Sequence, residues 1–470
     1  MTKPQPIFTA AATGNTPPTP AITSTDQRRK RCGTPTTSLS LDGDILCIIF
    51  AFLNMFDLVR CSLVCKFWNA ILESRSLREF YEKKLLKDSS SSSESTKKSL
   101  SVVLREVAME QHRLALQCGA FHVDQWKGHS TAVSQCRMKM GTVVTGVGDK
   151  VIRVWSLDRY KCEEEYSVPD TLPLVDFDFD ESKIVGLIGS RLCIWRRNGK
   201  RSVFPSLEGK FITGSCMRYF DPEAMVGFDD GAVRVFDMYS RRCSQIIRMH
   251  SAPITCLCLS EDQLIVSGSA SGNITISDPS SVQKVARLGS SDFRGIKTLC
   301  LKPSSQLLFA GSAVGYTYCW DMRTRRLLWE KRVSPNVVYS LQHMQNDKST
   351  LAVGGIDGIL RFVNQNDGNI VSSCIMEDKL WATYQSHSGS IRRKKGKRLP
   401  EDTYINIDVI PKNSRPSITC LAVGMKKIVT THNARDIRLW KLKDKNIYDR
   451  LSCLMDMEKK HSYKRIFGWR

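Results

Sequence analysis

The chain has 470 residues, enough for about two to four folded units, and its 41% hydrophobic and 25% charged residues are ordinary for globular protein. Its longest apolar run, Ile45 to Leu53, is too short for a membrane-spanning helix, which needs about 20 residues. The formal net charge of +22 raises nucleic acid as a partner, but +14 of it lies in residues 1–40 (+4), 378–416 (+5) and 441–470 (+5).

Residues 1–38 are rich in Pro, Thr and Ala and lack a charged-then-apolar leader, so we expect a disordered tail in an intracellular protein of the nucleus and/or cytoplasm. The 17 cysteines are scattered singly, which favours reduced core thiols over disulfides. Neither Cys61–Cys65 nor Cys256–Cys258 has a second ligand pair at zinc spacing. We therefore expect no metal site and no cofactor.

The apolar run predicts a helix that is apolar on all sides. One face holds Ile45, Ile48, Ile49, Phe52 and Leu53, and the opposite face holds Leu46, Cys47, Phe50 and Ala51. Such a helix must be covered on all sides. Residues 39–86, bounded by the tail and by a Ser-rich linker at 87–99, build only a marginal core, so one side of this helix is expected to meet another molecule.

The residues around this helix follow the order of a known motif: Leu41, Ile45, Leu46, Ile49, Phe50, Leu53, Asp57, Leu58, Val64, Cys65 and Trp68. This order resembles the F-box, with Asp42 in place of the usual proline and Asp44 in place of glutamate. Asp57 is expected to cap a second short helix, and "LVCKFWNAILES" predicts a third. A longer helix is predicted over residues 100–119, ended by Gly119.

From residue 120 the pattern changes to short β-type runs that repeat along the chain. Their anchor positions are Trp155, Trp195, Phe236, Ser277, Trp320, Val363 and Trp440, at intervals of 40, 41, 41, 43, 43 and 77 residues. Removing an insertion of about 35 residues, at about 378–416, restores the period. The spacing resembles the WD-repeat β-propeller. The predicted fold is therefore multidomain, α plus all-β: a small helical F-box, a helical linker and a seven-bladed propeller at 120–442, followed by a basic tail at 443–470.

The segment "FHVDQW" is expected to supply the outer strand of the last blade and so close the ring. In the first blade, His129, Thr145, Asp149 and Trp155 stand at the family's structural hydrogen-bonding positions. The His–Asp pair resembles half a catalytic triad, but tying a loop to a strand explains it better. The sequence has no phosphate-cradling loop, no HExxH, no GxSxG and no kinase signature, so we expect a connector and not an enzyme.

Together the two resemblances identify the chain as similar to the F-box/WD-repeat proteins, and the short, divergent propeller looks eukaryotic and plant-like. The resemblance implies a substrate receptor of Skp-cullin-F-box ubiquitin ligases, whose F-box binds a Skp-family adaptor while the propeller's top face binds a protein target. The residues expected to divide between the motif's core and the adaptor interface are Leu41, Ile45, Leu46, Ile49, Phe50, Leu53, Asp57, Leu58, Val59, Leu63, Val64, Cys65 and Trp68.

The target side is less specific. Relatives that read phosphorylated targets place arginines at two sets of top-face positions. The first set here offers Lys150 and Arg435, with Arg191 nearby, on neighbouring blades, and the second set offers Ser134, Thr255 and Thr419, none of them basic. A shallow basic stripe for an acidic or phosphorylated target is one interpretation, and scattered surface charge is the other.

The insertion contains "SIRRKKGKRLPED", which is expected to hang from the top face as a loop. Its basic residues, Arg392, Arg393, Lys394, Lys395, Lys397 and Arg398, favour nuclear localisation, with Arg28 to Arg31 as a second candidate. Attraction of an acidic target, contact with nucleic acid, and a plain solvated loop remain open. The alternative function is a nuclear scaffold or RNA-associated WD-repeat protein that uses the basic tails and the insertion.

Overall fold

The structure is a computed structural model, and the residues it describes are 42–53, 55–86, 99–119, 121–139, 141–168, 172–197, 201–204, 213–260, 262–281, 283–289, 294–344, 349–386, 389–400, 407, 410–424 and 426–442. The chain divides into two compact units, residues 1–100 and 101–470. Predictions on Leu41, on Arg28 to Arg31, on most of the Ser-rich linker and on the tail at 443–470 lie outside the described residues.

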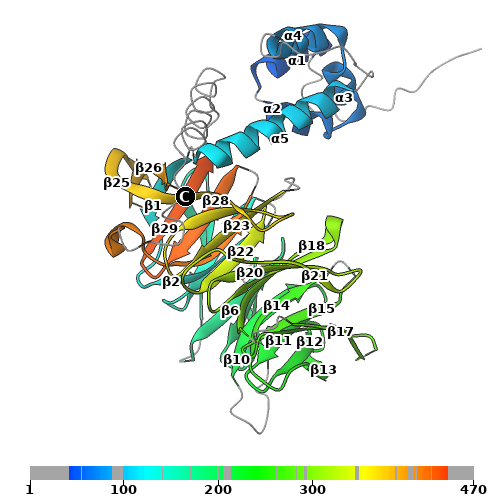
Figure 1. Ribbon diagram of the computed structural model, residues 1–470, viewed down its shortest axis with the longest axis vertical. Coiled ribbons are helices and arrows are strands. Elements are labelled where there is room, and N and C mark those ends of the chain that lie inside the picture. The colour runs from blue at the N-terminus through cyan, green and yellow to red at the C-terminus, as the bar shows by residue number, and fades with distance from the viewer. Residues whose placement is uncertain are drawn as a thin grey trace, which may run out of the picture. The chain divides into compact units, whose positions relative to one another are not determined.

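The described residues of the first unit fold into short helices (Figure 1). They are α1 (Gly43–Phe52), α2 (Met55–Ser62), α3 (Lys66–Leu72) and α4 (Arg75–Leu86). α1 contacts α3 and α4, and α3 contacts α2 and α4. The small core between them includes Leu46 and Phe50 from α1, Leu58 from α2, Leu72 from α3 and Tyr81 from α4.

Phe50 lies at the centre of that core. Its ring packs edge-on against Trp68 with 5.5 Å between ring centroids, and its side chain is 1% exposed. The buried Tyr81 hydroxyl donates a hydrogen bond to the Phe50 carbonyl (3.2 Å). A buried polar group of this kind needs a partner, and here the partner is the carbonyl end of α1, so one bond satisfies Tyr81 and fastens α4 to α1.

The helix α5 (Leu100–Cys118) begins the second unit and stops where predicted, because Gly119 adopts the left-handed conformation with φ of +61°. The Ser372 hydroxyl donates to the Leu116 carbonyl near the end of α5 (2.6 Å), which ties the helix to the outer strand of the sixth blade. The strand β1 (Phe121–Lys127) follows directly.

After α5, the described residues of this unit form seven antiparallel four-stranded blades and one additional strand, and blades 1 to 5 are separate sheets. Blade 1 holds β2 (Val133–Lys139), β3 (Thr142–Val147), β4 (Val151–Ser156) and β5 (Lys161–Ser167); blade 2 holds β6 (Leu174–Phe179), β7 (Lys183–Ile188), β8 (Arg191–Arg196) and β9 (Arg201–Val203); blade 3 holds β10 (Gly214–Phe220), β11 (Glu223–Phe228), β12 (Ala232–Asp237) and β13 (Arg242–Arg248).

The remaining blades follow in chain order. Blade 4 holds β14 (Ile254–Leu259), β15 (Ile265–Ser269), β16 (Asn273–Asp278) and β17 (Gln283–Gly289); blade 5 holds β18 (Ile296–Lys302), β19 (Leu307–Ser312), β20 (Tyr316–Asp321) and β21 (Arg326–Arg332), with a 3-10 turn at Pro303–Ser305; blade 6 holds β22 (Val338–His343), β23 (Thr350–Gly355), β24 (Leu360–Asn364) and β25 (Ile370–Ser386); blade 7 holds β27 (Ile418–Val423), β28 (Lys427–His432) and β29 (Asp436–Leu442), completed by β1, with a 3-10 turn at Lys412–Ser414 before it.

The ring closes through the pairing of β1 with β29, which runs from Phe121 opposite Leu442 to Lys127 opposite Asp436. The innermost strands contact one another in the cyclic order β2, β6, β10, β14, β18, β22 and β27. The predicted fold class, a helical F-box followed by a WD-type propeller, is confirmed. Each anchor residue predicted from the repeat lies in the third strand of its blade and is buried there.

The insertion corrects one prediction. Instead of a loop, β25 continues past the sixth blade and turns back as β26 (Gly389–Arg398). β26 pairs with β25 on one side and with β1 on the other, so blades 6 and 7 form one nine-stranded sheet, in yellow to orange and cyan in Figure 1. Backbone hydrogen bonding to two strands explains why this basic segment is ordered as sheet.

Candidate functional site

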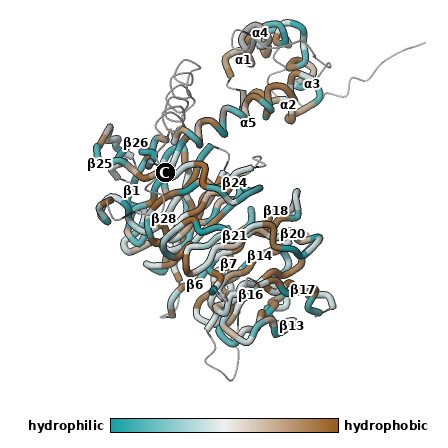
Figure 2. The backbone as a smooth tube through the Cα atoms, in the orientation of Figure 1, coloured by the Kyte–Doolittle hydropathy of each residue, from teal (hydrophilic) through white to brown (hydrophobic). Residues whose placement is uncertain are grey.

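One face of α1 presents apolar side chains to solvent. Ile45, Ile48, Ile49 and Phe52 follow one another at helical spacing, and their exposed fractions range from 40% to 86%. Leu46 and Phe50, on the other face, are buried in the four-helix core. The predicted two-sided helix is therefore divided between a core face and an exposed face. Figure 2 shows hydrophobic stretches, in brown, along this unit as well as along the propeller.

More exposed apolar residues come from the neighbouring helices: Leu63 and Val64 between α2 and α3, Phe67 in α3, and Phe80 in α4. We call these four residues and the exposed face of α1 the apolar set. An isolated surface leucine needs no explanation, but eight large apolar side chains exposed on a unit of this size are typical of a protein–protein interface.

The predicted adaptor residues are divided by the structure. Ile45, Ile49, Leu63, Val64 and Cys65 are exposed; Leu53, Asp57, Val59 and Trp68 are half-buried; and Leu46, Phe50 and Leu58 are buried. The prediction missed four exposed residues: Ile48, Phe52, Phe67 and Phe80. Helical spacing places Ile48 and Phe52 on one stripe with Ile45 and Ile49, but neither is a position of the F-box pattern from which the adaptor residues were taken.

Local geometry corrects the predicted capping role of Asp57 and gives Cys65 a structural role. Asp57 lies inside the first turn of α2 and accepts a hydrogen bond from Arg60 (3.2 Å), so it is not the residue before the helix. Cys65 is the N-cap of α3, where its thiol accepts from the Trp68 N–H (3.4 Å). Burial and the nearby Asp57 carboxylate raise the pKa of the Cys61 thiol, which suits packing better than reactivity.

The predicted hydrogen-bonding positions in blade 1 form one chain of contacts. His129 Nδ1 lies 2.9 Å from the Asp149 carboxylate and His129 Nε2 lies 2.8 Å from Thr145 Oγ1, which also accepts from Trp155 Nε1 (2.7 Å). Burial alone would raise the pKa of Asp149, but hydrogen bonds from Arg153 and His129 outweigh it and hold that pKa at about 2. The polar side-chain atoms of these residues all form hydrogen bonds within the blade. We therefore assign the group a structural role.

The predicted basic stripe lies at equivalent turns of three consecutive blades. Arg435 is in the turn before β29, Lys150 is in the turn before β4, and Arg191 opens β8. We call the face with the turns between second and third strands the turn face. Arg435 is exposed and the other two are half-buried, so all three side chains reach the surface of blades 7, 1 and 2.

Sequence reasoning missed a cavity of about 500 Å³ on the same face, between blades 6 and 7. Ile356 and Asp357, from the turn before β24, form one wall, and Lys412, Arg415 and Pro416 from the connection into blade 7 form another. Arg415 donates to the Asp357 carbonyl (3.2 Å), which fixes that connection to blade 6. The cavity combines apolar walls with cationic groups, as protein-binding clefts often do.

The basic run of the insertion has a partner within the propeller. Arg393 on β26 donates through Nε and Nη2 to both carboxylate oxygens of Asp124 (2.5 and 2.9 Å), and Asp124 is fully buried. Lys441 Nζ lies 3.3 Å from the same carboxylate, and Tyr160 also donates to it. Although burial opposes ionisation, these partners lower the pKa of Asp124. β26 is thus part of the folded sheet, and nuclear localisation stays a prediction.

No helix in the part of the chain that the structure describes is long and apolar enough to cross a membrane. Among the same residues there is no group of three or more His, Cys, Asp and Glu side chains placed to hold a metal ion.

Comparison with known proteins agrees with both units. Residues 38–80 match the F-box domain, and residues 241–278 match the WD domain, G-beta repeat. A 131-residue stretch is 26% identical to mitochondrial division protein 1 of Sclerotinia sclerotiorum, covering 28% of this chain and 18% of that protein. An F-box/WD-40 repeat-containing protein of Arabidopsis thaliana is 49% identical over 440 residues, covering 88% of this chain and 96% of the relative. The chain therefore belongs to the F-box/WD-40 repeat-containing proteins.

Proposed function

We propose that this protein is the substrate-recognition subunit of a Skp-cullin-F-box ubiquitin ligase, in which the F-box unit binds a Skp-family adaptor and the turn face of the propeller binds a protein target. F-box domains in general bind such adaptors, and members of this family are generally non-catalytic. The single observation that carries the proposal is the exposed stripe of Ile45, Ile48, Ile49 and Phe52 within the matched F-box.

Energetics support the use of this stripe as an interface. Burying one large apolar side chain is worth about 1.5–3 kcal/mol, so a few of these residues suffice for stable association. Residues near the centre of such an interface contribute most of the binding energy. The buried Leu46 and Phe50 act indirectly, because they hold α1 in the orientation that exposes the stripe.

The target half of the proposal rests on the turn face. The cavity between blades 6 and 7 and the stripe of Arg435, Lys150 and Arg191 lie on consecutive blades, 6, 7, 1 and 2. A cleft that combines apolar and cationic side chains, beside a basic stripe, suits a peptide with apolar and acidic residues. The chain would then supply proximity and orientation, while its partner subunits carry out ubiquitin transfer.

The test is the triple variant Ile45→Asp, Ile49→Asp and Phe52→Asp, purified with a Skp-family adaptor. We expect adaptor affinity to fall more than 100-fold, because three anchors become charged. Leu46 and Phe50 are left unchanged, since an aspartate at either would bury a charge in the helical core. Affinity purification with mass spectrometry from cells should find target proteins on the variant and on the unmodified chain, and the adaptor only on the latter.

A matched control is Ile246→Asp, Leu327→Asp and Leu328→Asp, three exposed apolar residues on the outer strands β13 and β21. It introduces the same three charges and should leave adaptor binding unchanged. Helical circular dichroism of both variants checks the fold. Failure of the unmodified chain to bind any Skp-family adaptor would refute the proposed function.

A further inference from the structure

A pocket opens between blades 4 and 5, at the ends of the strands opposite the turn face. Its volume is about 320 Å³, and it lies beside the turns that join first to second strands and third to fourth strands. Its apolar walls come from both blades: Leu264, Ile276 and Ala286 from blade 4, and Leu301 and Met322 from blade 5. Val285 also lines it and is 36% exposed, so the pocket is open to solvent. We call it the seam pocket.

One small residue distinguishes this seam from the next. Ala286, on the fourth strand of blade 4, lies opposite the residue before the anchor Ser277. Trp329 has the same position in blade 5, opposite the residue before the anchor Trp320. Its indole is buried and packs in a cluster of residues from blades 5 and 6. Protein interiors are close-packed, and where blade 4 has an alanine in place of this indole, the seam keeps a pocket.

Trp329 shows which contacts such a place offers to an aromatic ring. Its Nε1 donates to the carbonyl of Gln365, two residues after the anchor of blade 6 (2.8 Å), and its ring lies directly against Gly368, five residues after that anchor. The corresponding residues after the anchor of blade 5 are Met322 and Arg325, and both line the seam pocket. Gly368 and Arg325 also share a positive φ (73° and 58°). The seam pocket is therefore the counterpart of the place that Trp329 fills.

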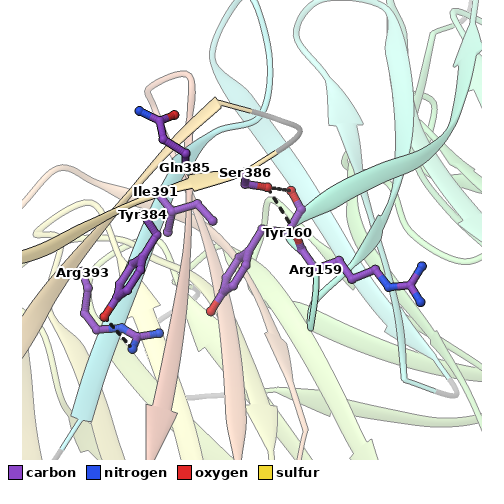
Figure 3. A pocket seen from close by; sticks show the side chains of 7 residues that line it. All are labelled: Arg159, Tyr160, Tyr384, Gln385, Ser386, Ile391 and Arg393. Atoms are coloured by element: carbon purple, nitrogen blue, oxygen red, sulfur yellow. Dashed lines mark hydrogen bonds between the residues drawn. The ribbon is translucent and has the colours of Figure 1, made fainter.

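Two other seams are filled by large side chains. Between blades 7 and 1, the ring of Tyr160 packs on Trp126 with 5.4 Å between ring centroids, and its hydroxyl donates to Asp124. Figure 3 shows this ring on the blade 1 turn, beside the β25–β26 hairpin. Between blades 6 and 7, Leu116 of α5 packs in the core cluster of these two blades. A seam can thus be completed by an aromatic ring, or by a side chain from outside the blades.

The rim of the seam pocket toward blade 5 is positively charged. Arg325 lies in the turn before β21 and Arg326 opens that strand, and both side chains are exposed. Asp321, the carboxylate of the same turn, accepts hydrogen bonds from the Arg323 N–H and the Thr324 hydroxyl (both 2.9 Å). Among the residues that the structure describes, the guanidinium groups of Arg325 and Arg326 form no ion pair and no hydrogen bond. Both cations are therefore available to a ligand.

We propose that the seam pocket is a docking site for a tryptophan side chain of a partner protein, carried by a peptide segment with acidic residues next to the tryptophan. The site goes beyond the proposed function and does not depend on it, because it lies away from the turn face and outside the F-box unit.

An aromatic ring suits the seam pocket better than an aliphatic side chain. The guanidinium of Arg325 can lie over the face of a ring, and the Met322 thioether makes favourable contacts with ring edges. The Met322 carbonyl corresponds to the Gln365 carbonyl that accepts the Trp329 N–H. A volume of about 320 Å³ is at the lower end of the range for ligand pockets, as expected for a single anchoring side chain.

The acidic flank follows from the charges of the rim. Arg325 and Arg326 are on the blade 5 side, whereas the exposed carboxylate of Asp262 is on the blade 4 side. Charge complementarity therefore favours a peptide whose acidic residues lie toward blade 5. The chain's own tail at 443–470 contains Trp469, but its net positive charge suits these arginines poorly. A partner protein is thus the better occupant.

The experiment measures binding of fluorescently labelled eight-residue peptides to the full chain, at low and moderate salt. One peptide has a tryptophan followed by two glutamates, a second has the reverse order, and both have Gly and Ser elsewhere. Companion peptides carry alanine in place of tryptophan. We expect salt-sensitive binding of at least one tryptophan peptide, and at least tenfold weaker binding of its alanine companion.

The first variant is Ala286→Trp, which places an indole where blade 5 has Trp329. We expect it to fill the seam pocket, to keep or raise the melting temperature, and to bind the tryptophan peptide at least tenfold more weakly. The matched control is Gln283→Trp, which adds the same side chain at an exposed position of the same strand, outside the lining of the pocket. It should leave peptide binding unchanged.

The second variant, Arg325→Gln with Arg326→Gln, tests the rim and keeps the proposal open to refutation should Ala286→Trp not fold. We expect about three- to tenfold weaker binding at low salt and a smaller difference at moderate salt. The matched control is Arg241→Gln with Arg242→Gln, two exposed arginines at the same distance from the anchor of blade 3. It should bind the peptide as the unmodified chain does.

Four results would overturn the proposal: no binding of either tryptophan peptide by the unmodified chain, equal binding of the alanine companions, undiminished binding by folded Ala286→Trp, or equal weakening in a control variant. A chain ended after residue 442 that binds the peptide more than tenfold more tightly would assign the pocket to the chain's own tail instead. Adaptor binding, measured on the same preparations and expected to be unchanged in every variant, keeps this test apart from the proposed function.

Discussion

The two units of this protein place apolar and charged residues in opposite ways. The helical unit exposes the apolar set, including Phe52 at 86%, and its buried residues are nearly all hydrophobic. The propeller buries charges such as Asp124, Asp176 and Arg361 beside partners of opposite sign. A unit that exposes apolar residues gains stability when a partner covers them, whereas a unit that buries charges depends on each pair staying complete.

The largest expected effect comes from breaking one buried ion group in the propeller. Asp124→Asn keeps the shape of the side chain but leaves Arg393 and Lys441 without their shared carboxylate, so we expect a loss of about 3–5 kcal/mol in unfolding free energy. Urea denaturation followed by tryptophan fluorescence measures it. Asp158→Asn is the control, because that carboxylate is 86% exposed and its pair with Lys427 contributes about 0.2–1 kcal/mol. Equal losses of unfolding free energy in Asp124→Asn and Asp158→Asn would contradict the expected difference between a buried and an exposed ion pair.

The helical unit offers a matched pair of phenylalanines two residues apart. Phe50→Ala removes a side chain that is 1% exposed and packed against Trp68, and should cost about 3–5 kcal/mol in the stability of this unit. Phe52→Ala should change stability by about 0.5 kcal/mol or less but weaken adaptor binding. Thermal unfolding followed by helical circular dichroism, with adaptor affinity, separates the two. A large stability loss in Phe52→Ala would mean that Phe52 is a core residue.

Acid should destabilise the propeller but not the helical unit, and the expected loss of stability per residue is smaller than in the two predictions above. Burial lowers the pKa of His129, His343 and His432, and it lowers that of His250 to about 4. These groups are neutral in the folded propeller while their unfolded counterparts protonate near pH 6.5, so propeller stability should fall as pH drops from about 6.5 to about 4. His250 alone should account for about 1–3 kcal/mol of that loss.

Residues 42–100 contain no histidine, so the helical unit should keep its stability over the upper part of this pH range. Scanning calorimetry at pH 7, about 6 and about 5 tests this, with a propeller transition that moves to lower temperature while the helical one stays. In His250→Gln the pH dependence of the propeller transition should become shallower. Parallel movement of both transitions would rule out the histidines as the cause.

Much of the fold could be predicted because its signals are local or periodic. The anchors from Trp155 to Trp440 recur at a nearly constant interval once the insertion is removed, and each occupies the same strand of its blade. The F-box order from Ile45 to Trp68 likewise located the helical unit. The division of α1 could not be predicted, because both of its faces are apolar and only the packing of Trp68 and Tyr81 on Phe50 distinguishes them.

The insertion was predicted wrongly for a related reason. Its run of basic residues is typical of a solvated loop, but Arg393 finds its carboxylate 269 residues earlier in the chain, at Asp124. A partner so distant in the sequence cannot be recognised from the residues around the basic run. Phe67 and Phe80 were missed because neither belongs to the F-box pattern, and their exposure depends on how α3 and α4 pack.

The closure of the ring by β1 has a consequence for how the protein is made. Gln125 donates to Asp436 across a separation of 311 residues, so β1 leaves the ribosome long before the strand it pairs with. At about 5–20 residues per second, the interval is about 15–60 s. During that time β1 presents an unpaired edge. A chain terminated anywhere before β29 could pair β1 with β26 but would lack the pairing of β1 with β29 that closes the ring, so early termination should leave an open ring however many blades are complete.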